Sequence, residues 1–568
     1  MTDLHCDYDV IIAGLGPTGL VLAHTLGMQG ISVLVLEREP RFYGNARAVF
    51  TDGECMRIFQ SIGMADRLLA DMIEDVPIQV MRADRQVLAT MLNPERPYGW
   101  SQSNFFYQPF LETALAEGLS RYPSVQVRRG REVLRFAQDG EGVWVEHQAS
   151  AGSWGGAAGA ATPPEGADAP ASPPERTRAR YLVGADGGRS VVRTQLGIGM
   201  QGTAFPSPWL VVDIKAKAGL QGLRHLPYFS FVCDPDCPTV NCVQPQGHHR
   251  FEFMLAPGQT KAQMEDPATV RGYLARWVNV DDFDVLRQLV YTFNALVADR
   301  WRQGRVLLAG DAAHMTPQFV GQGMNAGVRD AHNLGWKLAA VLRGQSGPAL
   351  LDSYETERRP HVTAMIREAV RMKDFVSVSS PAKARVRDAL FKLLTTAPWL
   401  GRQIRQGRYM PQPLLERGQY LGLPRRRRRG LEGRLSVQPR ARGANGCLQR
   451  MDDPLGYRFT LLGAGVDPRT LLPAATRQWC ADMGMGFGVV YRWGARPHGG
   501  IEARWPADLV ELEDVSGAWY AALAQGGHGE GAVLVLRPDK FIFGVGRGSQ
   551  LGAVVDALRQ QLRTTPPA

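Results

Sequence analysis

The sequence predicts an α/β protein that also carries α+β elements. Three observations support this class. Residues 8–37 read as strand, glycine-rich turn, helix and strand. Residues 205–260 alternate apolar and polar side chains, and residues 445–568 contain short strands and a final helix. Alternation of this kind is typical of an antiparallel sheet with one covered face. The 568 residues allow about three domains at roughly 100–200 residues each.

The composition is that of a folded protein: 44% of the residues are hydrophobic and 21% are charged. These values exclude a wholly disordered or fibrous chain. No apolar run reaches the roughly 18–20 residues that span a bilayer. The opening residues have no basic segment followed by a long apolar one, so we expect no signal peptide and a cytoplasmic protein.

The net charge of +10 is partly local, because Arg425–Arg429 is an uninterrupted basic run. Such a run is most often a solvated loop or a patch for acidic partners. No nucleic-acid-binding motif accompanies it. Three of the seven cysteines cluster near a histidine pair, without the paired spacing of a zinc finger, so we expect reduced thiols and no metal. This cluster consists of Cys233, Cys237, Cys242, His248 and His249.

The N-terminal segment has the pattern of a Rossmann-like unit. Tyr8–Ala13 is a β-branched apolar strand, a GxGxxG turn follows it, and Ile31–Leu36 is a second strand. In such a turn Gly14 makes the tight bend, Gly16 lets a diphosphate approach, and Gly19 allows close helix packing. The helix N-terminus favours the diphosphate charge. Glu37 ends the second strand, where it can accept hydrogen bonds from a ribose.

Two later segments distinguish FAD from NAD. One is YLVGADGGRSVVR, which places Asp186 and Gly187 after a strand; the other is RVLLAGDAAH, which places Gly310 and Asp311 after another. Each puts a carboxylate beside glycine at the carboxyl end of a strand, where backbone can approach a ligand. Together with the first turn, and in this order, they indicate FAD.

On these motifs the chain resembles the single-component flavoprotein aromatic hydroxylases, built like p-hydroxybenzoate and phenol hydroxylase. The resemblance covers about residues 8–400. The segment GDAAHMTPQFVGQGMNAGVRDAHNLGWKLA, with FEFMLAPG at 251–258 and RPDKFIFGV near the C-terminus, is closest to the 3-(3-hydroxyphenyl)propionate/3-hydroxycinnamate hydroxylases.

The resemblance implies FAD contacts. Asp311 would bind the ribityl chain, the segment from Gly321 to Asn325 would bind the flavin's pyrimidine edge, and Asp186 would serve both FAD and the nicotinamide donor. Arg47 and Gln108 match positions that contact FAD in relatives, although Arg47 could instead be a surface charge. The expected cofactor-binding residues are Gly14, Gly16, Pro17, Thr18, Gly19, Glu37, Arg38, Arg47, Gln108, Asp186, Gly310, Asp311, Gly321, Gly323, Met324 and Asn325.

Two residues are catalytic candidates by the same resemblance. Asp52 aligns with an acid that faces the substrate hydroxyl in phenol hydroxylase, where a carboxylate would make the ring a better nucleophile. Alternatively, Asp52 caps a helix beginning near Gly53. Arg250, just before the strand FEFML, would pair with a substrate carboxylate or the flavin, or else form a rim ion pair. His314 is interpreted as a structural hydrogen-bonding residue.

The expected domains are a monooxygenase region at 1–400, a linker at 401–444 and a thioredoxin-like domain at 445–568. Within the first, the substrate sheet would occupy about 75–105 and 200–295. The Ala/Gly/Pro-rich residues 149–177 would form a long hairpin loop. The last domain lacks CxxC, so it cannot exchange dithiols, and we interpret it as structural or oligomeric.

The predicted function is hydroxylation of a phenolic acid ortho to its hydroxyl with NAD(P)H and O₂. The resemblance implies 3-(3-hydroxyphenyl)propionate and 3-hydroxycinnamate as substrates. The nicotinamide would bind transiently, because only one dinucleotide fold is present. Alternatives are hydroxylation of another phenol or polyketide, a flavin oxidase or dehydrogenase, and a non-catalytic scaffold. The expected partners are a small aromatic substrate and possible homodimer contacts, without nucleic acid or membrane.

Overall fold

The computed structural model describes most of the chain. The described residues are 6–42, 47–150, 152, 173–205, 208–219, 223, 225–421, 430–497 and 509–563. The run Arg425–Arg429 lies outside them, as does most of the predicted loop at 149–177. In the described part of the chain, no helix is both long and apolar enough to cross a membrane.

An eight-stranded sheet forms the centre of the first unit. Its main path is β19 (Arg302–Gln303), β20 (Val306–Leu308), β11 (Glu175–Gly184), β1 (Tyr8–Ala13), β2 (Val33–Glu37) and β8 (Val125–Arg129). β1 runs parallel to β2 and to β11, and α1 (Pro17–Gly27) makes the crossover between β1 and β2. This arrangement confirms the Rossmann-like unit. The second strand begins two residues later than predicted and includes Glu37.

A long antiparallel extension leaves this sheet at β11. β10 (Val143–Ala149) pairs with β11 and also with β9 (Arg131–Gln138). His147 stands opposite Glu175 in the ladder. The two strands are therefore joined as a hairpin, and they extend further toward the loop than the sequence pattern indicates.

The second sheet is predominantly antiparallel, as expected. Its order is β17 (Phe283–Tyr291), β13 (Trp209–Ala216), β16 (His248–Met254), β15 (Thr239–Val243), β14 (Phe229–Val232), β5 (Ile78–Met81) and β6 (Val87–Met91). One face packs on α6 (Lys261–Met264) and α7 (Pro267–Leu274) through an apolar cluster that includes Phe251 and Phe253. The predicted range 200–295 is too wide, because β12 (Met200–Ala204) pairs instead with β18 (Asn294–Ala298) in a separate sheet with β21 (His314–Met315).

Helices and a small sheet connect these two sheets. The small sheet consists of β3 (Phe50–Thr51), β7 (Asn104–Phe106) and β4 (Met72–Glu74). The helices are α2 (Gly53–Ser61), α3 (Ala65–Leu69), α4 (Gln108–Gly118), α5 (Val191–Gln195), α8 (Gly323–Leu342), α9 (Asp352–Val376), α10 (Pro381–Thr396) and α11 (Pro398–Arg405). α8 is buried along almost its whole length.

The C-terminal unit contains its own seven-stranded sheet. The order is β23 (Leu448–Arg450), β22 (Arg440–Gly443), β26 (Leu509–Asp514), β25 (Gly486–Arg492), β24 (Thr460–Ala464), β27 (Ala532–Leu536) and β28 (Ile542–Arg547). The helices are α12 (Asp452–Leu455), α13 (Ala474–Asp482), α14 (Ala518–Gln525) and α15 (Gln550–Arg563). β24 and β25 are parallel across α13, and β27 and β28 form an antiparallel pair before α15. This βαβ and ββα arrangement agrees with the expected thioredoxin-like topology.

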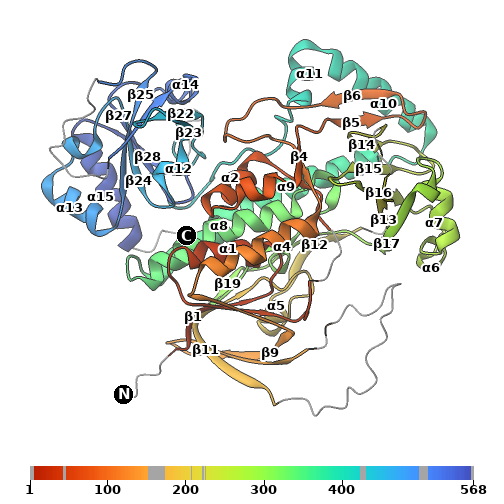
Figure 1. Ribbon diagram of the computed structural model, residues 1–568, viewed down its shortest axis with the longest axis horizontal. Helices are drawn as coiled ribbons and strands as arrows, with labels where there is room; N and C mark the ends of the chain where they lie inside the picture. Colours follow the sequence, from red (N-terminus) through yellow and green to blue (C-terminus); the bar gives the residue numbers. More distant parts are fainter. Residues whose placement is uncertain are drawn as a thin grey trace.

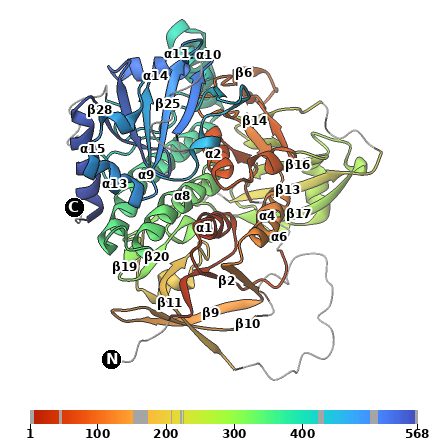
Figure 2. The ribbon, with the colours of Figure 1, turned by 60° about the vertical axis from the view of Figure 1, so that its left-hand side comes forward.

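The C-terminal unit begins earlier than predicted. Its strand β22 reads RARG and lies inside the range assigned to a linker, and α11 crosses the boundary set at residue 400. Only Ala441 and Gly443 are buried in β22, so the strand has no apolar pattern to reveal it. In Figures 1 and 2, the C-terminal unit and the sheet of β13–β17 lie on opposite sides of α1 and α8.

Candidate active site

The glycine-rich turn has the geometry that a diphosphate requires. Gly14 has φ +104°, and a Cβ there would lie 2.4 Å from the carbonyl oxygen of Ala185. A Cβ on Gly19 would lie 2.1 Å from the carbonyl oxygen of Gly14, so larger residues are excluded at both positions. A Cβ added to Gly16, the N-cap of α1, would meet no atom within 4 Å. The first turn of α1, with Pro17 at its start, is thus open to an anion.

The Gly310 motif and α8 meet the glycine-rich turn at Thr18. A Cβ added to Gly310 would lie 2.5 Å from the Thr18 hydroxyl oxygen, and one added to Gly327 would lie 2.1 Å from it. The Asp186 motif adjoins Gly14 through a hydrogen bond from the Ala185 N–H to Ala13. The turn, both carboxylate motifs and α8 therefore meet at the carboxyl edge of the central sheet.

Glu37 lies where a ribose acceptor is expected. Its carboxylate accepts hydrogen bonds from the backbone N–H groups of Leu15, at 2.7 Å, and Glu39, at 2.9 Å. A carboxylate offers about four acceptor positions, so two hydroxyls can still bind. Arg38 is half exposed and pairs with Glu39 at 3.4 Å.

Arg47 and Gln108 lie together, as the resemblance implies. The Gln108 side-chain oxygen accepts from the backbone N–H groups of Arg47, at 2.5 Å, and Ala48, at 2.6 Å. Its amide donates to Glu112, and burial raises the pKa of Glu112 to about 7 although that hydrogen bond opposes the shift. Gln108 therefore fixes the backbone at Arg47.

The two carboxylate motifs have different surroundings. Asp186 accepts from the Ser190 hydroxyl at 2.5 Å and from the Val192 N–H at 3.1 Å, and burial raises its pKa against these bonds. By contrast, no described residue hydrogen-bonds or forms an ion pair with the Asp311 carboxylate. Asp311 therefore remains available for ligand hydroxyls, while Asp186 also organises the start of α5.

The N-terminus of α8 presents unused backbone donors. Gly321 has φ +62° and packs against Phe50, and Asn325 bonds back to the carbonyl oxygens of both Gly321 and Phe50. Within the described chain, the N–H groups of Gly323, Met324 and Asn325 donate to no residue. Such donors at a helix N-terminus favour negative charge.

Asp52 is the N-cap of α2, which begins at Gly53. It accepts from the Cys55 N–H at 3.0 Å and pairs with Arg329 at 2.5 Å, and Gln322 donates to it at 3.2 Å. Burial alone would raise its pKa, but Arg329 and the hydrogen bonds hold the pKa below the ordinary value. The helix-cap interpretation is confirmed. Proton acceptance by Asp52 stays a prediction, and the lowered pKa does not favour it.

Arg250 lies within β16 rather than before it. Its guanidinium pairs with Asp213 at 2.7 Å and donates to the carbonyl oxygen of Arg47 at 2.5 Å. Asp213 also pairs with Arg287 at 2.7 Å. Arg250 is thus a buried link between the second sheet and the cofactor edge, and not a rim ion pair.

His314 has a buried structural environment. Its Nε2 lies 2.5 Å from Asp330, which also pairs with Arg358 at 2.9 Å and accepts from the Gly310 N–H. The predicted structural role agrees with this geometry. Among the described residues, no group of three or more His, Cys, Asp or Glu side chains is arranged to hold a metal.

Sequence reasoning missed several charged partners at this site. Arg329 joins Asp52 to Glu54, and Gln318 joins the segment before α8 to Glu252. Arg287 completes the Asp213 pair. All come from segments distant in the sequence, so no local spacing could indicate them.

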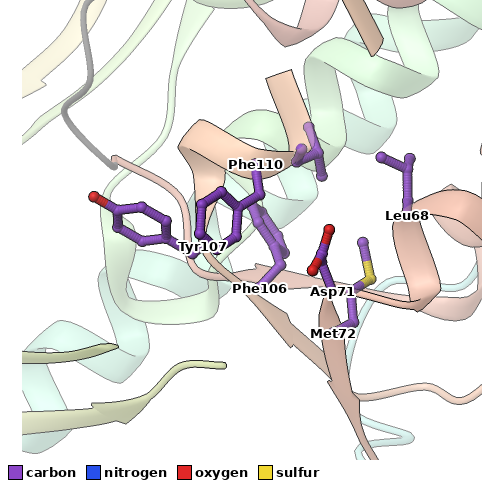
Figure 3. Close-up of a pocket in the computed structure, with 7 residues that line it drawn as sticks. Leu68, Asp71, Met72, Phe106, Tyr107 and Phe110 are labelled. Atoms are coloured by element: carbon purple, nitrogen blue, oxygen red, sulfur yellow. The ribbon is translucent and has the colours of Figure 1, made fainter. Parts of the chain in front are cut away.

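A separate shallow hollow lies at the start of α4. Figure 3 shows its lining, with Tyr107 and Phe110 on one side and Asp71 and Met72 on another. Tyr107 stacks on His248 with ring centroids 3.9 Å apart. The hollow has no interior volume that even a water-sized molecule could occupy, so it is not assigned as the substrate site.

The residues present fit FAD. Three features lie at the carboxyl edge of the central sheet, and each fits one part of FAD. The open turn at Gly16 fits the diphosphate, the Asp311 carboxylate fits the ribityl hydroxyls, and the N–H groups that begin α8 fit the flavin ring. The fold and these features define an FAD-binding oxidoreductase.

Comparisons with known proteins agree. A family model described as "FAD binding domain" matches residues 7–369, and one described as "HcaD C-terminal domain" matches residues 433–561. Proteins named 3-(3-hydroxy-phenyl)propionate/3-hydroxycinnamic acid hydroxylase are similar over nearly the whole chain. That of Paraburkholderia xenovorans is 33% identical, covering 98% of this chain and 92% of its own, and that of Mycobacterium avium is 37% identical, covering 99% and 93%.

Solved structures show the same fold. Aklavinone-11 hydroxylase with FAD and aklavinone has a TM-score of 0.75 at 24% identity, covering 98% of this chain and 99% of its own. Anhydrotetracycline hydroxylase from Streptomyces rimosus has 0.71 at 25%, covering 99% and 100%. The chain belongs to the single-component FAD-dependent aromatic hydroxylases and is a flavoprotein monooxygenase.

Proposed function

We propose that this enzyme hydroxylates a phenolic acid ortho to its hydroxyl group, using NADH or NADPH and O₂. The proposed substrates are 3-(3-hydroxyphenyl)propionate and 3-hydroxycinnamate, and the products are their 2,3-dihydroxy derivatives. The names of the relatives support this substrate class. A cytoplasmic location and a homodimer stay predictions.

The observation that carries the proposal is the charge on β13, β16 and β17. Arg250 and Arg287 both pair with the carboxylate of Asp213, and Arg250 also lies 3.9 Å from Glu252. Among the described residues, the Arg287 Nε is buried without a hydrogen-bond partner. Positive charge in a buried site attracts an anion strongly, because little water screens it. A substrate carboxylate is such an anion, and a neutral phenol is not.

The chain's own residues bind and orient the reactants. When bound, FAD would supply the redox chemistry, which is acceptance of a hydride from the nicotinamide and activation of O₂. Asp311 would hold the ribityl hydroxyls, and the donors of α8 would favour negative charge at the flavin edge. The apolar side chains of Trp209 and Phe319, with ring centroids 5.3 Å apart, would exclude water near the substrate ring.

The test compares phenols that differ only in the acid group. Purified enzyme receives NADH or NADPH with 3-(3-hydroxyphenyl)propionate or with 3-ethylphenol as the neutral control, and dihydroxy product is measured against nicotinamide oxidised. We expect efficient coupling for the acid and a KM about 10- to 100-fold higher for the neutral phenol, as charge-assisted bonds of about 1.5–3 kcal/mol imply. Equal values for both would contradict the role of the arginines.

A further inference from the structure

The strand β16 presents two chemically different faces. His249, Phe251 and Phe253 point away from the FAD-binding unit, and the two phenylalanines join the cluster under α6 and α7. The alternate residues Arg250 and Glu252 point toward that unit. Arg250 reaches the backbone of Arg47, and Glu252 reaches Gln318. Glu252 therefore faces the same space as the cofactor edge.

Glu252 is a buried acid that shares Arg250 with Asp213. It is 4% exposed, and within the described residues only the Gln318 amide hydrogen-bonds to it. Arg250 lies 3.9 Å away, but its guanidinium is already paired with Asp213 at 2.7 Å. A second arginine, Arg287, is also paired with Asp213.

The bond to Gln318 gives Glu252 its position. Gln318 opens the short 3₁₀ helix Gln318–Val320, which lies directly before Gly321 and the N-terminus of α8. This is the segment expected to hold the reactive end of the flavin. Phe319, beside Gln318, packs on Trp209 from β13. An acid and an apolar aromatic pair therefore lie on either side of the segment that precedes α8.

The charges around Glu252 come from each strand next to it. Arg250 lies on β16, Asp213 on β13, Arg287 on β17 and Cys242 on β15. Burial raises the pKa of Glu252 to about 7; Arg250 opposes the shift, Asp213 adds to it, and Arg287 and the Gln318 amide oppose it.

Asp52 and Glu252 are suited to different tasks. The Asp52 pKa is held below its ordinary value by Arg329, so its carboxylate binds a proton weakly at neutral pH. A general base works best when its pKa lies near the operating pH. Glu252 meets this condition and Asp52 does not.

We propose that Glu252 is the proton acceptor for the phenolic hydroxyl of the substrate. This inference rests on the proposed function and names the base in that same site. In the step, the phenol O–H bond breaks and an O–H bond forms on a Glu252 carboxyl oxygen. The electron pair remains on the phenolate oxygen, so no oxidation or reduction accompanies the transfer. The Gln318 amide keeps the receiving carboxylate in place.

The test compares Glu252→Gln with Asp52→Asn and Glu252→Asp, each loaded with FAD. The first readout is the Kd of 3-(3-hydroxyphenyl)propionate between pH 5.5 and 9, followed by the change in flavin absorbance and independent of turnover. We expect the affinity of the wild-type enzyme to rise as pH passes through about 7, because only the ionised Glu252 carboxylate can accept the hydrogen bond from the phenolic hydroxyl and later its proton. Glu252→Gln should lose this transition, and Asp52→Asn and Glu252→Asp should keep one.

The second readout is the hydroxylation rate with phenols of different acidity. Glu252→Gln should slow hydroxylation of the unsubstituted substrate by about 10²–10⁴-fold, the usual contribution of a general base. The loss should shrink for ring-fluorinated substrates, whose hydroxyl ionises without help. A uniform loss across the series, or an unchanged affinity transition in Glu252→Gln, would overturn the assignment, as would loss of that transition in Asp52→Asn alone. A wild-type enzyme that shows the transition but forms no dihydroxy product would instead contradict the proposed function.

Discussion

At the scale of single residues, some polar side chains of the site are bonded to other residues of the protein, and others are available to bind ligands. Asp52, Asp186 and Arg250 are all engaged in hydrogen bonds or ion pairs. Asp311 is not. Since an unpartnered carboxylate is unfavourable unless water or a ligand binds it, Asp311 has the strongest claim to a direct cofactor contact.

Replacing Asp311 with alanine should therefore weaken FAD retention. The change removes the acceptor for the ribityl hydroxyls, and charge-assisted hydrogen bonds of about 1.5–3 kcal/mol imply a roughly 10- to 100-fold weaker affinity. Flavin content after gel filtration and titration of the apoprotein with FAD measure this. Asp556→Ala, at an exposed position on α15 of the C-terminal unit, serves as a control, and an Asp311→Ala enzyme that holds flavin as tightly as the control would refute the role.

Local sequence patterns predict the glycines and the strand-end carboxylates, because both depend on neighbours along the chain. Gly14, Gly19 and Gly310 each stand where a side chain would collide. The partners of Asp52 and Glu252 could not be found this way. Arg329 and Gln318 meet them only after the chain has folded, so the balance of charge that sets each pKa is a tertiary property.

At the scale of elements, the extension formed by β9, β10 and β11 stands apart from the cofactor edge. β11 contributes its final residues to the central sheet and its first residues to the hairpin with β10. The sequence assigns residues 149–177 to a loop, whereas β10 reaches Ala149 and β11 already begins at Glu175. The outer residues of β11, ERTRAR, are mostly charged and so give no apolar strand pattern.

Deleting residues 152–174 should leave the enzyme active. Four residues, 148–151, then remain between His147 and Glu175, which are opposite each other in the ladder, and four-residue hairpin loops are common. We expect flavin content and turnover within about twofold of wild type, because a Gly/Ala/Pro segment buries little. Steady-state hydroxylation and the visible flavin spectrum measure it. A folded, yellow deletion with little activity would show that the segment takes part in function.

At the scale of the whole molecule, the C-terminal unit is joined to the flavin-binding unit by buried charges. Arg537 pairs with Glu357 of α9 at 2.8 Å, and Glu357 also pairs with Lys337 of α8 at 2.7 Å. Asp539 accepts from the Trp336 indole at 3.0 Å. The C-terminal unit thus contacts α8, the helix whose N-terminus lies at the cofactor edge.

Arg537→Met should destabilise the whole protein strongly. Arg537 and Glu357 are fully buried, and removing one partner of a buried ion pair costs about 3–5 kcal/mol, since the other charge is left unpaired. Chemical denaturation followed by far-ultraviolet circular dichroism and flavin release measures this. Arg492→Met, which breaks an exposed pair with Glu530 at 3.6 Å, is the matched control and should change stability by less than about 1 kcal/mol. Equal effects of the two variants would show that the buried pair does not join the units.

The central claim is that this flavoprotein transfers one oxygen atom from O₂ to a phenolic acid beside its hydroxyl. The most direct measurement supplies ¹⁸O₂, NADH or NADPH and 3-(3-hydroxyphenyl)propionate to the purified enzyme and analyses the product by mass spectrometry and NMR. The account predicts a 2,3-dihydroxy product carrying one ¹⁸O atom. Nicotinamide oxidation that yields only hydrogen peroxide, or a product whose new oxygen comes from water, would contradict it.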